Sequence, residues 1–152
     1  MKKILILLQL ILILTLSSCG GYKSVYSAKS YNFNITSIEI IGNKQIGSNI
    51  KNALKIFSNV ESNNQISIKI TSTNTISITS KDSKGDPKTY AMTINSSLEI
   101  SQNDIKMTKS FTETFGYNNK SNKFDLKKYE RNIQNNLTEK ITENITLYLS
   151  TI

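Results

Sequence analysis

The middle of the chain alternates between apolar and polar residues. The five isoleucines between residues 66 and 78 all lie at even-numbered positions, and hydroxyl or lysine side chains occupy the odd-numbered positions. Because successive side chains of a strand point to opposite faces, this pattern predicts a strand with one apolar face. The pattern returns after the turn-forming segments 81–88 and 101–104, so we predict three consecutive antiparallel strands. Their apolar positions are Ile66, Ile68, Ile70, Ile76 and Ile78, then Tyr90, Met92, Ile94, Leu98 and Ile100, and then Ile105, Met107, Phe111 and Phe115.

The flanking segments predict one more strand and two helices. Segment 34–41 is rich in β-branched residues and predicts a strand, which Gly42 and Asn43 end. Segment 46–57 carries apolar residues at helical spacing and predicts a short amphipathic helix. From about Asn122 the apolar residues recur every three or four positions, which predicts a helix of about 40 Å. Asn122 and Asp125 resemble the capping box that begins many helices.

These elements predict the fold class. Two amphipathic helices and a sheet with one apolar face bury their apolar sides most simply against each other. We therefore predict an α+β, two-layer sandwich in which two helices cover one face of a four-stranded, mostly antiparallel sheet, in the order β-α-β-β-β-α. Ile133 and Leu137 lie in the middle of the long helix's stripe and are expected core residues. The apolar stripes look sufficient to close one core and no more.

The first residues predict export. Lys2 and Lys3 precede an apolar run over residues 4–16, which is too short to span a bilayer and is typical of a signal peptide. The following Leu-Ser-Ser-Cys, ending at Cys19, resembles the bacterial lipobox, in which the cysteine thiol receives lipid. We expect a signal peptide at 1–18, a lipidated tether at 19–33 and one α+β domain at 34–152. The alternative is an ordinary signal peptide or short anchor with an incidental cysteine.

The unique cysteine is therefore interpreted as an anchor. Cys19 is the only cysteine, so no disulfide can form within the monomer, and a lipidated thiol has no redox or catalytic role. Several acyl chains on one residue would make membrane attachment effectively permanent. Gly20, not aspartate, follows Cys19, which by resemblance to lipoprotein sorting rules favours the periplasmic side of the outer membrane.

Charge and residue types restrict the chemistry. The formal net charge is +8 and the chain contains no histidine, the commonest general base and metal ligand. No nucleophile elbow or phosphate-binding loop is present, so we expect no enzyme activity, cofactor or metal. Asp82 and Asp86 flank Gly85, and turn formation is favoured over a calcium site there. The basic balance suits phosphorylated lipids and not nucleic acid in an exported protein, although an AT-rich genome explains part of the lysine content.

The chain resembles a known family. The segment "CGGYKSVY" after the predicted cleavage site, the element order and the ending "YNNKSNKFDLKKYERNIQNNLTEKI" are similar to the LPS-assembly lipoprotein LptE family, in its short alphaproteobacterial form. The resemblance implies a non-enzymatic protein that sits inside the LptD outer-membrane β-barrel. It also implies roles in the assembly of that barrel and in lipopolysaccharide transport to the cell surface.

Two features supply candidate binding residues. The polar face of the predicted sheet is rich in serine and threonine and could hydrogen-bond the polar lumen of a barrel, or be a simple solvent face. Lys81, Lys84 and Lys88 surround the turn at 81–88 and could bind lipopolysaccharide phosphates, or only keep the turn soluble. The next candidates for lipopolysaccharide binding are Lys69, Lys106 and Lys109. A lipid-carrier or transporter accessory lipoprotein and a structural outer-membrane lipoprotein remain the alternative functions.

Overall fold

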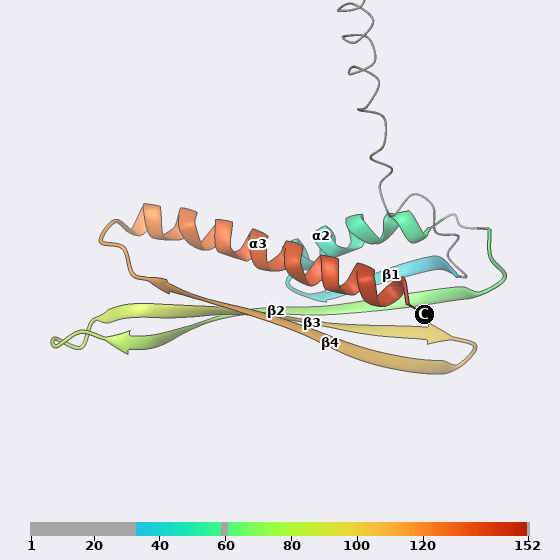
Figure 1. Cartoon of the computed structure of the whole chain (residues 1–152), viewed down its shortest axis with the longest axis horizontal. Coiled ribbons are helices and arrows are strands. Elements are labelled where there is room, and N and C mark those ends of the chain that lie inside the picture. The colour runs from blue at the N-terminus through green and yellow to red at the C-terminus, as the bar shows by residue number, and fades with distance from the viewer. Residues whose placement is uncertain (1–32, 59–60, 152) are drawn as a thin grey trace, which may run out of the picture. The chain divides into compact units, whose positions relative to one another are not determined.

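The computed structural model describes residues 33–58 and 61–151, in which two helices cover one face of a four-stranded sheet (Figure 1). The elements are β1 (Asn34–Gly42), α2 (Lys44–Leu54), the 3₁₀ turn η1 (Lys55–Phe57), β2 (Gln65–Lys81), β3 (Pro87–Gln102), β4 (Ile105–Asn118) and α3 (Lys123–Leu149). This confirms the predicted α+β class and element order. The predicted signal peptide 1–18, Cys19 and the tether as far as residue 32 lie outside the described residues.

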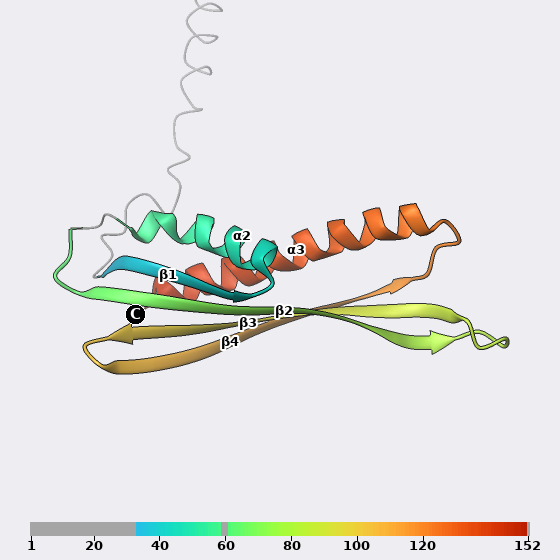
Figure 2. The same cartoon turned by 180° about the vertical axis from the view of Figure 1, so that it is seen from behind.

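The sheet order follows the chain, β1-β2-β3-β4. β1 and β2 are parallel, and the other two pairs are antiparallel. Two parallel neighbours need a crossover connection, and α2 supplies it on the apolar side of the sheet (Figure 2). Gly42 ends β1 with a φ of +80°, where a Cβ atom would collide with the carbonyl oxygen of Ser72.

Local signals fix the turns and the helix starts. Asn43 caps α2 by accepting a hydrogen bond from the N–H of Ile46 at 3.2 Å. Asn122 caps α3 by accepting bonds from Phe124 N–H at 2.9 Å and Asp125 N–H at 3.4 Å, so the predicted helix start is confirmed. The β3–β4 turn contains two residues with positive φ, as two-residue hairpins of the right twist require.

The core lies between the inner face of the sheet and the two helices. Ile133 and Leu137 are 4% and 6% exposed, which confirms their predicted place in the core. Phe33, just before β1, is also buried and stacks on Phe57 with ring centroids 5.5 Å apart. The other buried hydrophobic residues are Ile35, Ile46, Ile50, Leu54, Ile66, Ile68, Ile70, Met92, Ile94, Leu98, Ile100, Tyr117, Leu126, Ile141, Ile145 and Leu149.

The prediction that the apolar stripes only just close one core is wrong. Five residues of the predicted apolar face lie on that face but are more than 40% exposed, namely Ile76, Ile78, Ile105, Met107 and Phe115. The cause is geometric, because β2, β3 and β4 are long strands. α2 packs on β1 and β2 and α3 packs on β3 and β4, and neither helix covers the whole length of these strands. Figure 1 shows the tip of the β2–β3 hairpin projecting past the first turn of α3. Apolar surface is therefore left over.

Candidate binding surfaces

The face of the sheet away from the helices carries mostly hydroxyl and amide side chains, and we name it the hydroxyl face. Cross-strand bonds tie it together, since Thr93 Oγ1 and Thr114 Oγ1 lie 2.9 Å apart and Asn95 Nδ2 donates to Thr112 Oγ1 at 2.7 Å. These side chains can both donate and accept hydrogen bonds. The register places on it Ser67, Thr71, Thr73, Thr75, Ser77, Thr89, Thr93, Asn95, Ser97, Thr108, Ser110, Thr112 and Thr114.

Charges on the outer side of β2, β3 and β4 gather near the β3–β4 turn. Glu99 lies 3.4 Å from Lys69 Nζ and 3.3 Å from Lys106 Nζ. The hydrogen bond from Lys106 is the largest influence on Glu99, and with the contribution of Lys69 it lowers the pKa of the carboxyl. Two of the six candidate lysines are therefore held in ion pairs with one carboxylate, which leaves them less available to a ligand.

The other end of the β2–β3 hairpin carries Lys81, Lys84 and Lys88, all exposed. Asp82 Oδ1 accepts the backbone N–H groups of Lys84 and Asp86, both at 2.9 Å. The Asp82 carboxylate thus holds the turn, as the sequence interpretation predicted. Separately, no cluster of three metal-ligating side chains occurs within residues 33–58 and 61–151. None of the ion pairs in that part of the chain involves the three tip lysines.

Lys109 lies apart from the other five candidates. Odd-numbered residues of β4 face the helices, so Lys109 is on the inner face, opposite Leu98. Its Nζ lies 6.0 Å from the centre of the Tyr148 ring, the outer limit for a cation–π contact. The sequence-predicted lysines therefore occupy three separate places, and only the hairpin tip brings three of them together.

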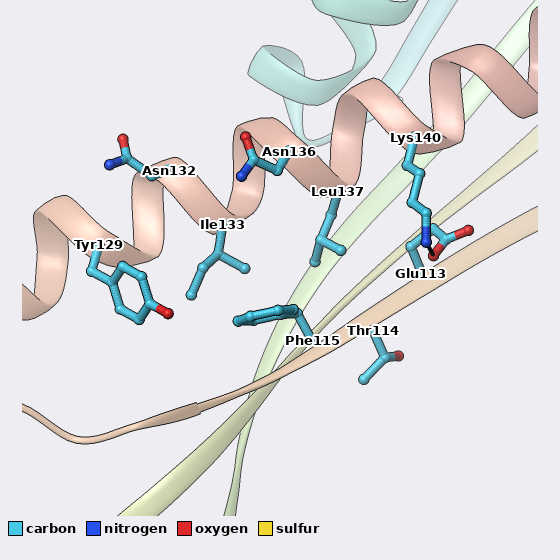
Figure 3. Close-up of a pocket in the computed structure, with 9 residues that line it drawn as sticks. All are labelled: Glu113, Thr114, Phe115, Tyr129, Asn132, Ile133, Asn136, Leu137 and Lys140. Atoms are coloured by element: carbon cyan, nitrogen blue, oxygen red, sulfur yellow. Dashed lines mark hydrogen bonds and ion pairs between the residues drawn. The ribbon is translucent and has the colours of Figure 1, made fainter.

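A groove that sequence reasoning missed runs between α3 and β4, with a volume of about 270 Å³. Figure 3 shows Phe115 of β4 beneath Ile133 and Leu137, which point toward it from α3. An ion pair between Glu113 and Lys140, 3.3 Å apart, closes one end. The alternation in the sequence contained a signal for this groove. Glu113 and Phe115 both lie at odd, inner-facing positions of β4, and α3 does not fully cover the inner face of that strand. The groove is lined by Glu113, Thr114, Phe115, Tyr129, Asn132, Ile133, Asn136, Leu137 and Lys140.

Aromatic residues continue from the other end of the groove. Tyr117 is buried, stacks on Tyr90 with centroids 5.6 Å apart and meets Tyr129 edge-on at 6.0 Å. Its hydroxyl donates a hydrogen bond to Glu130 Oε1 at 2.8 Å. Burial, followed by the contact with the Glu130 carboxylate, raises the pKa of Tyr117 far above its ordinary value. This phenol therefore stays protonated and serves as a hydrogen-bond donor to Glu130.

Within the described ranges, no helix combines the length and the apolar character needed to cross a membrane.

The fold is shared with solved bacterial lipoproteins. The crystal structure of rare lipoprotein B from Shewanella oneidensis matches with a TM-score of 0.59 and 9% identity, over 76% of this chain and 94% of that one. A minor lipoprotein from Acinetobacter baumannii gives 0.57 and 14%, over 81% and 95%. Lipoprotein B from Nitrosomonas europaea gives 0.53 and 11%, over 74% and 79%. At these identities the likeness concerns the fold alone. No model of a known protein family and no curated protein sequence matches the chain.

Proposed function

We propose that this protein is an outer-membrane lipoprotein of the LptE type, anchored on the periplasmic side through Cys19. In this proposal it plugs an LptD-type β-barrel, supports the assembly of that barrel and assists lipopolysaccharide transport. It acts without catalysis, cofactor or metal. The observation that carries the proposal is the hydroxyl face, and the sequence resemblance and the lipoprotein fold of the solved structures support it.

The hydroxyl face suits the lumen of a barrel for a physical reason. Burying an unpaired charge against another protein is costly, whereas a hydroxyl group can rotate and act as donor or acceptor. The lumen wall of a large outer-membrane barrel is polar. Strands β2, β3 and β4 present long rows of such groups, while Lys69 and Lys106 both pair with Glu99 near one end, which leaves that cluster with only one net positive charge.

The tip lysines supply the proposed contact with lipopolysaccharide. Lys81, Lys84 and Lys88 are exposed and outside the ion pairs of the described residues, so their ammonium groups are available to phosphates. The turn that carries them is held by Asp82 through backbone hydrogen bonds and needs no lysine side chain.

The decisive experiment places charge on the hydroxyl face. The double variant is Thr73→Asp with Ser110→Asp. It places one carboxylate on β2 and one on β4, at two exposed positions of the hydroxyl face. We expect the melting temperature to stay within a few degrees while the barrel no longer co-purifies from detergent-solubilised outer membranes. The matched control, Ser48→Asp with Asn49→Asp, adds the same charge on the exposed side of α2 and should retain the barrel.

Other outcomes contradict the proposal. If the wild-type protein brings down no barrel, or if the double variant retains it fully, the hydroxyl face is a solvent face. Bound phospholipid in place of a barrel would favour the second candidate, a lipid carrier. The observation that favours that candidate is the groove between α3 and β4, whose floor is Phe115.

A further inference from the structure

The edge of the sheet formed by β4 is long and regular, and no strand within residues 33–58 and 61–151 pairs with its outer side. β4 pairs with β3 over all fourteen of its residues without a register shift, contains no proline and is the last strand of the sheet. The opposite edge strand, β1, has nine residues and a bulge between Ile35 and Ser37, which are two common ways to prevent edge pairing. The β4 edge lacks both, so its unpaired backbone groups can accept another strand.

The structure shows which backbone groups face outward. Asn119 donates its backbone N–H to the carbonyl of Lys88, directly beyond the last ladder pair. In an antiparallel ladder the bonded pairs alternate, so the odd-numbered residues of β4 bond to β3. The even-numbered residues, such as Ser110 and Thr112, therefore direct N–H and C=O to the free edge.

The inner-facing side chains of this edge are arranged symmetrically about Phe111. Lys109 lies two residues before Phe111 and Glu113 lies two residues after it. Met107 lies four residues before Phe111 and Phe115 lies four residues after it. Met107 and Phe115 are 41% and 45% exposed, and Ile105 beyond them is 66% exposed. Opposite charges and two exposed apolar residues thus occupy mirrored positions on one strand.

We propose that the free edge of β4 pairs with β4 of a second copy of this chain, antiparallel about a two-fold axis at Phe111. In this register Glu113 stands opposite Lys109 of the second copy, and Phe115 stands opposite Met107 of the second copy. Each contact occurs twice, as a two-fold interface requires. These positions are non-hydrogen-bonded pairs, in which side chains lie closest.

Neighbouring registers lack this complementarity. A two-fold axis must pair residues of the same face, so the register can change only in steps that keep odd residues opposite odd ones. One step either way places Glu113 opposite Met107 or Phe111, and leaves both charges facing apolar residues. A further step places Lys109 opposite itself or Glu113 opposite itself, and like charges directly opposite destabilise a strand pair.

The side chains on the hydroxyl face also fit this antiparallel pairing of two β4 strands. Thr112 would stand opposite Ser110 of the second copy and Thr114 opposite Thr108, so the hydroxyl face continues across the interface. Glu113 already contacts Lys140 at 3.3 Å and accepts a hydrogen bond from Asn144. The second copy's Lys109 would join this cluster. The dimer protects the edge of the free protein and does not rest on the proposed function.

Disulfide trapping tests the register directly. In the full-length chain with Cys19→Ser, the added pair Met107→Cys and Phe115→Cys should form disulfide-linked dimers on mild oxidation in detergent solution. The two positions lie about 26 Å apart along one strand at 3.3 Å per residue, so they cannot bond within one chain. The matched control, Ile105→Cys with Phe115→Cys, needs a different register and should give little product.

Charge exchange tests the same interface without cysteines. By sedimentation, Glu113→Lys should raise the dimer dissociation constant about tenfold or more, because two attractive pairs become repulsive. The double variant Lys109→Glu with Glu113→Lys should restore it, although it does not restore the local contact with Lys140. A monomer at all concentrations, equal trapping of both cysteine pairs, failure of the double variant to recover, or trapping to a different protein instead would each overturn the proposal.

Discussion

At the scale of single residues, Glu99 shows how a charged group is tolerated on a face built of hydroxyls. Lys106 and Lys69 lower its pKa, so the folded state binds the proton more weakly than the unfolded state. Such a carboxylate stabilises the fold above its unfolded pKa, and that stabilisation is lost as the pH falls through the folded pKa.

This gives a prediction for Glu99→Gln. Between about pH 6 and about pH 3, the melting temperature of the wild type should fall more steeply than that of the variant. Differential scanning fluorimetry across this range measures both curves. Glu139→Gln, on the exposed side of α3, controls for the loss of one carboxylate. Parallel curves for wild type and Glu99→Gln would show that the three charges do not stabilise the folded state.

The buried serines show what residue-level reasoning from sequence could not supply. Ser72 and Ser96 are fully buried on the apolar face, and their hydroxyl oxygens lie 2.9 Å apart. Each satisfies the other, which removes most of the cost of burying a polar group. The even-numbered alternation places both on the inner face, but the partner of Ser72 depends on the register of β2 against β3, and the pattern of one strand does not contain it.

At the scale of elements, α3 holds the layers together. Its stripe supplies Leu137, which is 6% exposed, whereas Phe124 in its first turn is 70% exposed. We expect Leu137→Ala to cost about 2–5 kcal/mol of unfolding free energy, because it removes buried methyl groups and leaves a cavity. Phe124→Ala should change it by less than about 0.5 kcal/mol. Urea denaturation measures both, and equal effects would contradict the packing of this helix.

The strands show which parts of the fold could be predicted. Alternation assigned the faces of β2, β3 and β4 correctly, because the side-chain period of a strand is two. It could not assign burial, which depends on how far a helix extends over each strand. Ile76 and Ile105 therefore lie on the predicted face and remain exposed. For the same reason the groove beside Phe115 was missed.

The candidate lysines also show what the sequence pattern could and could not predict. Lys81, Lys84 and Lys88 could be grouped from sequence because a single turn contains them. Lys106 and Lys109 are close in sequence, yet their odd difference in position places them on opposite faces of β4. One joins Glu99 on the outer side and the other lies by Tyr148. Proximity in sequence therefore predicts a shared site in a turn and not along a strand.

At the scale of the whole molecule, the two proposed functions, contact with a barrel and binding of lipopolysaccharide, are assigned to different surfaces. The hydroxyl face is weakly charged over most of its length and is the proposed contact with a barrel wall. The tip of the β2–β3 hairpin projects past the first turn of α3 and carries the lysines that the ion pairs of the described residues leave free (Figure 1). A change at the tip should therefore affect ligand binding without affecting contact with the barrel.

The triple variant with Lys81, Lys84 and Lys88 changed to glutamate tests this division. It should bind lipopolysaccharide more weakly than the wild type, and the difference should grow at low salt, where screening of exposed charges is least. Its melting temperature should barely change, because Asp82 holds the turn through backbone groups.

A control with Lys44, Lys51 and Lys55 of the α2 region changed to glutamate alters the net charge equally. Binding to immobilised lipopolysaccharide, measured at two ionic strengths, separates a local site from a general charge effect. If both variants weaken binding equally, net charge and not the hairpin tip governs the interaction. If neither does, the ligand site lies elsewhere, and Lys109 beside Tyr148 is the next residue to change.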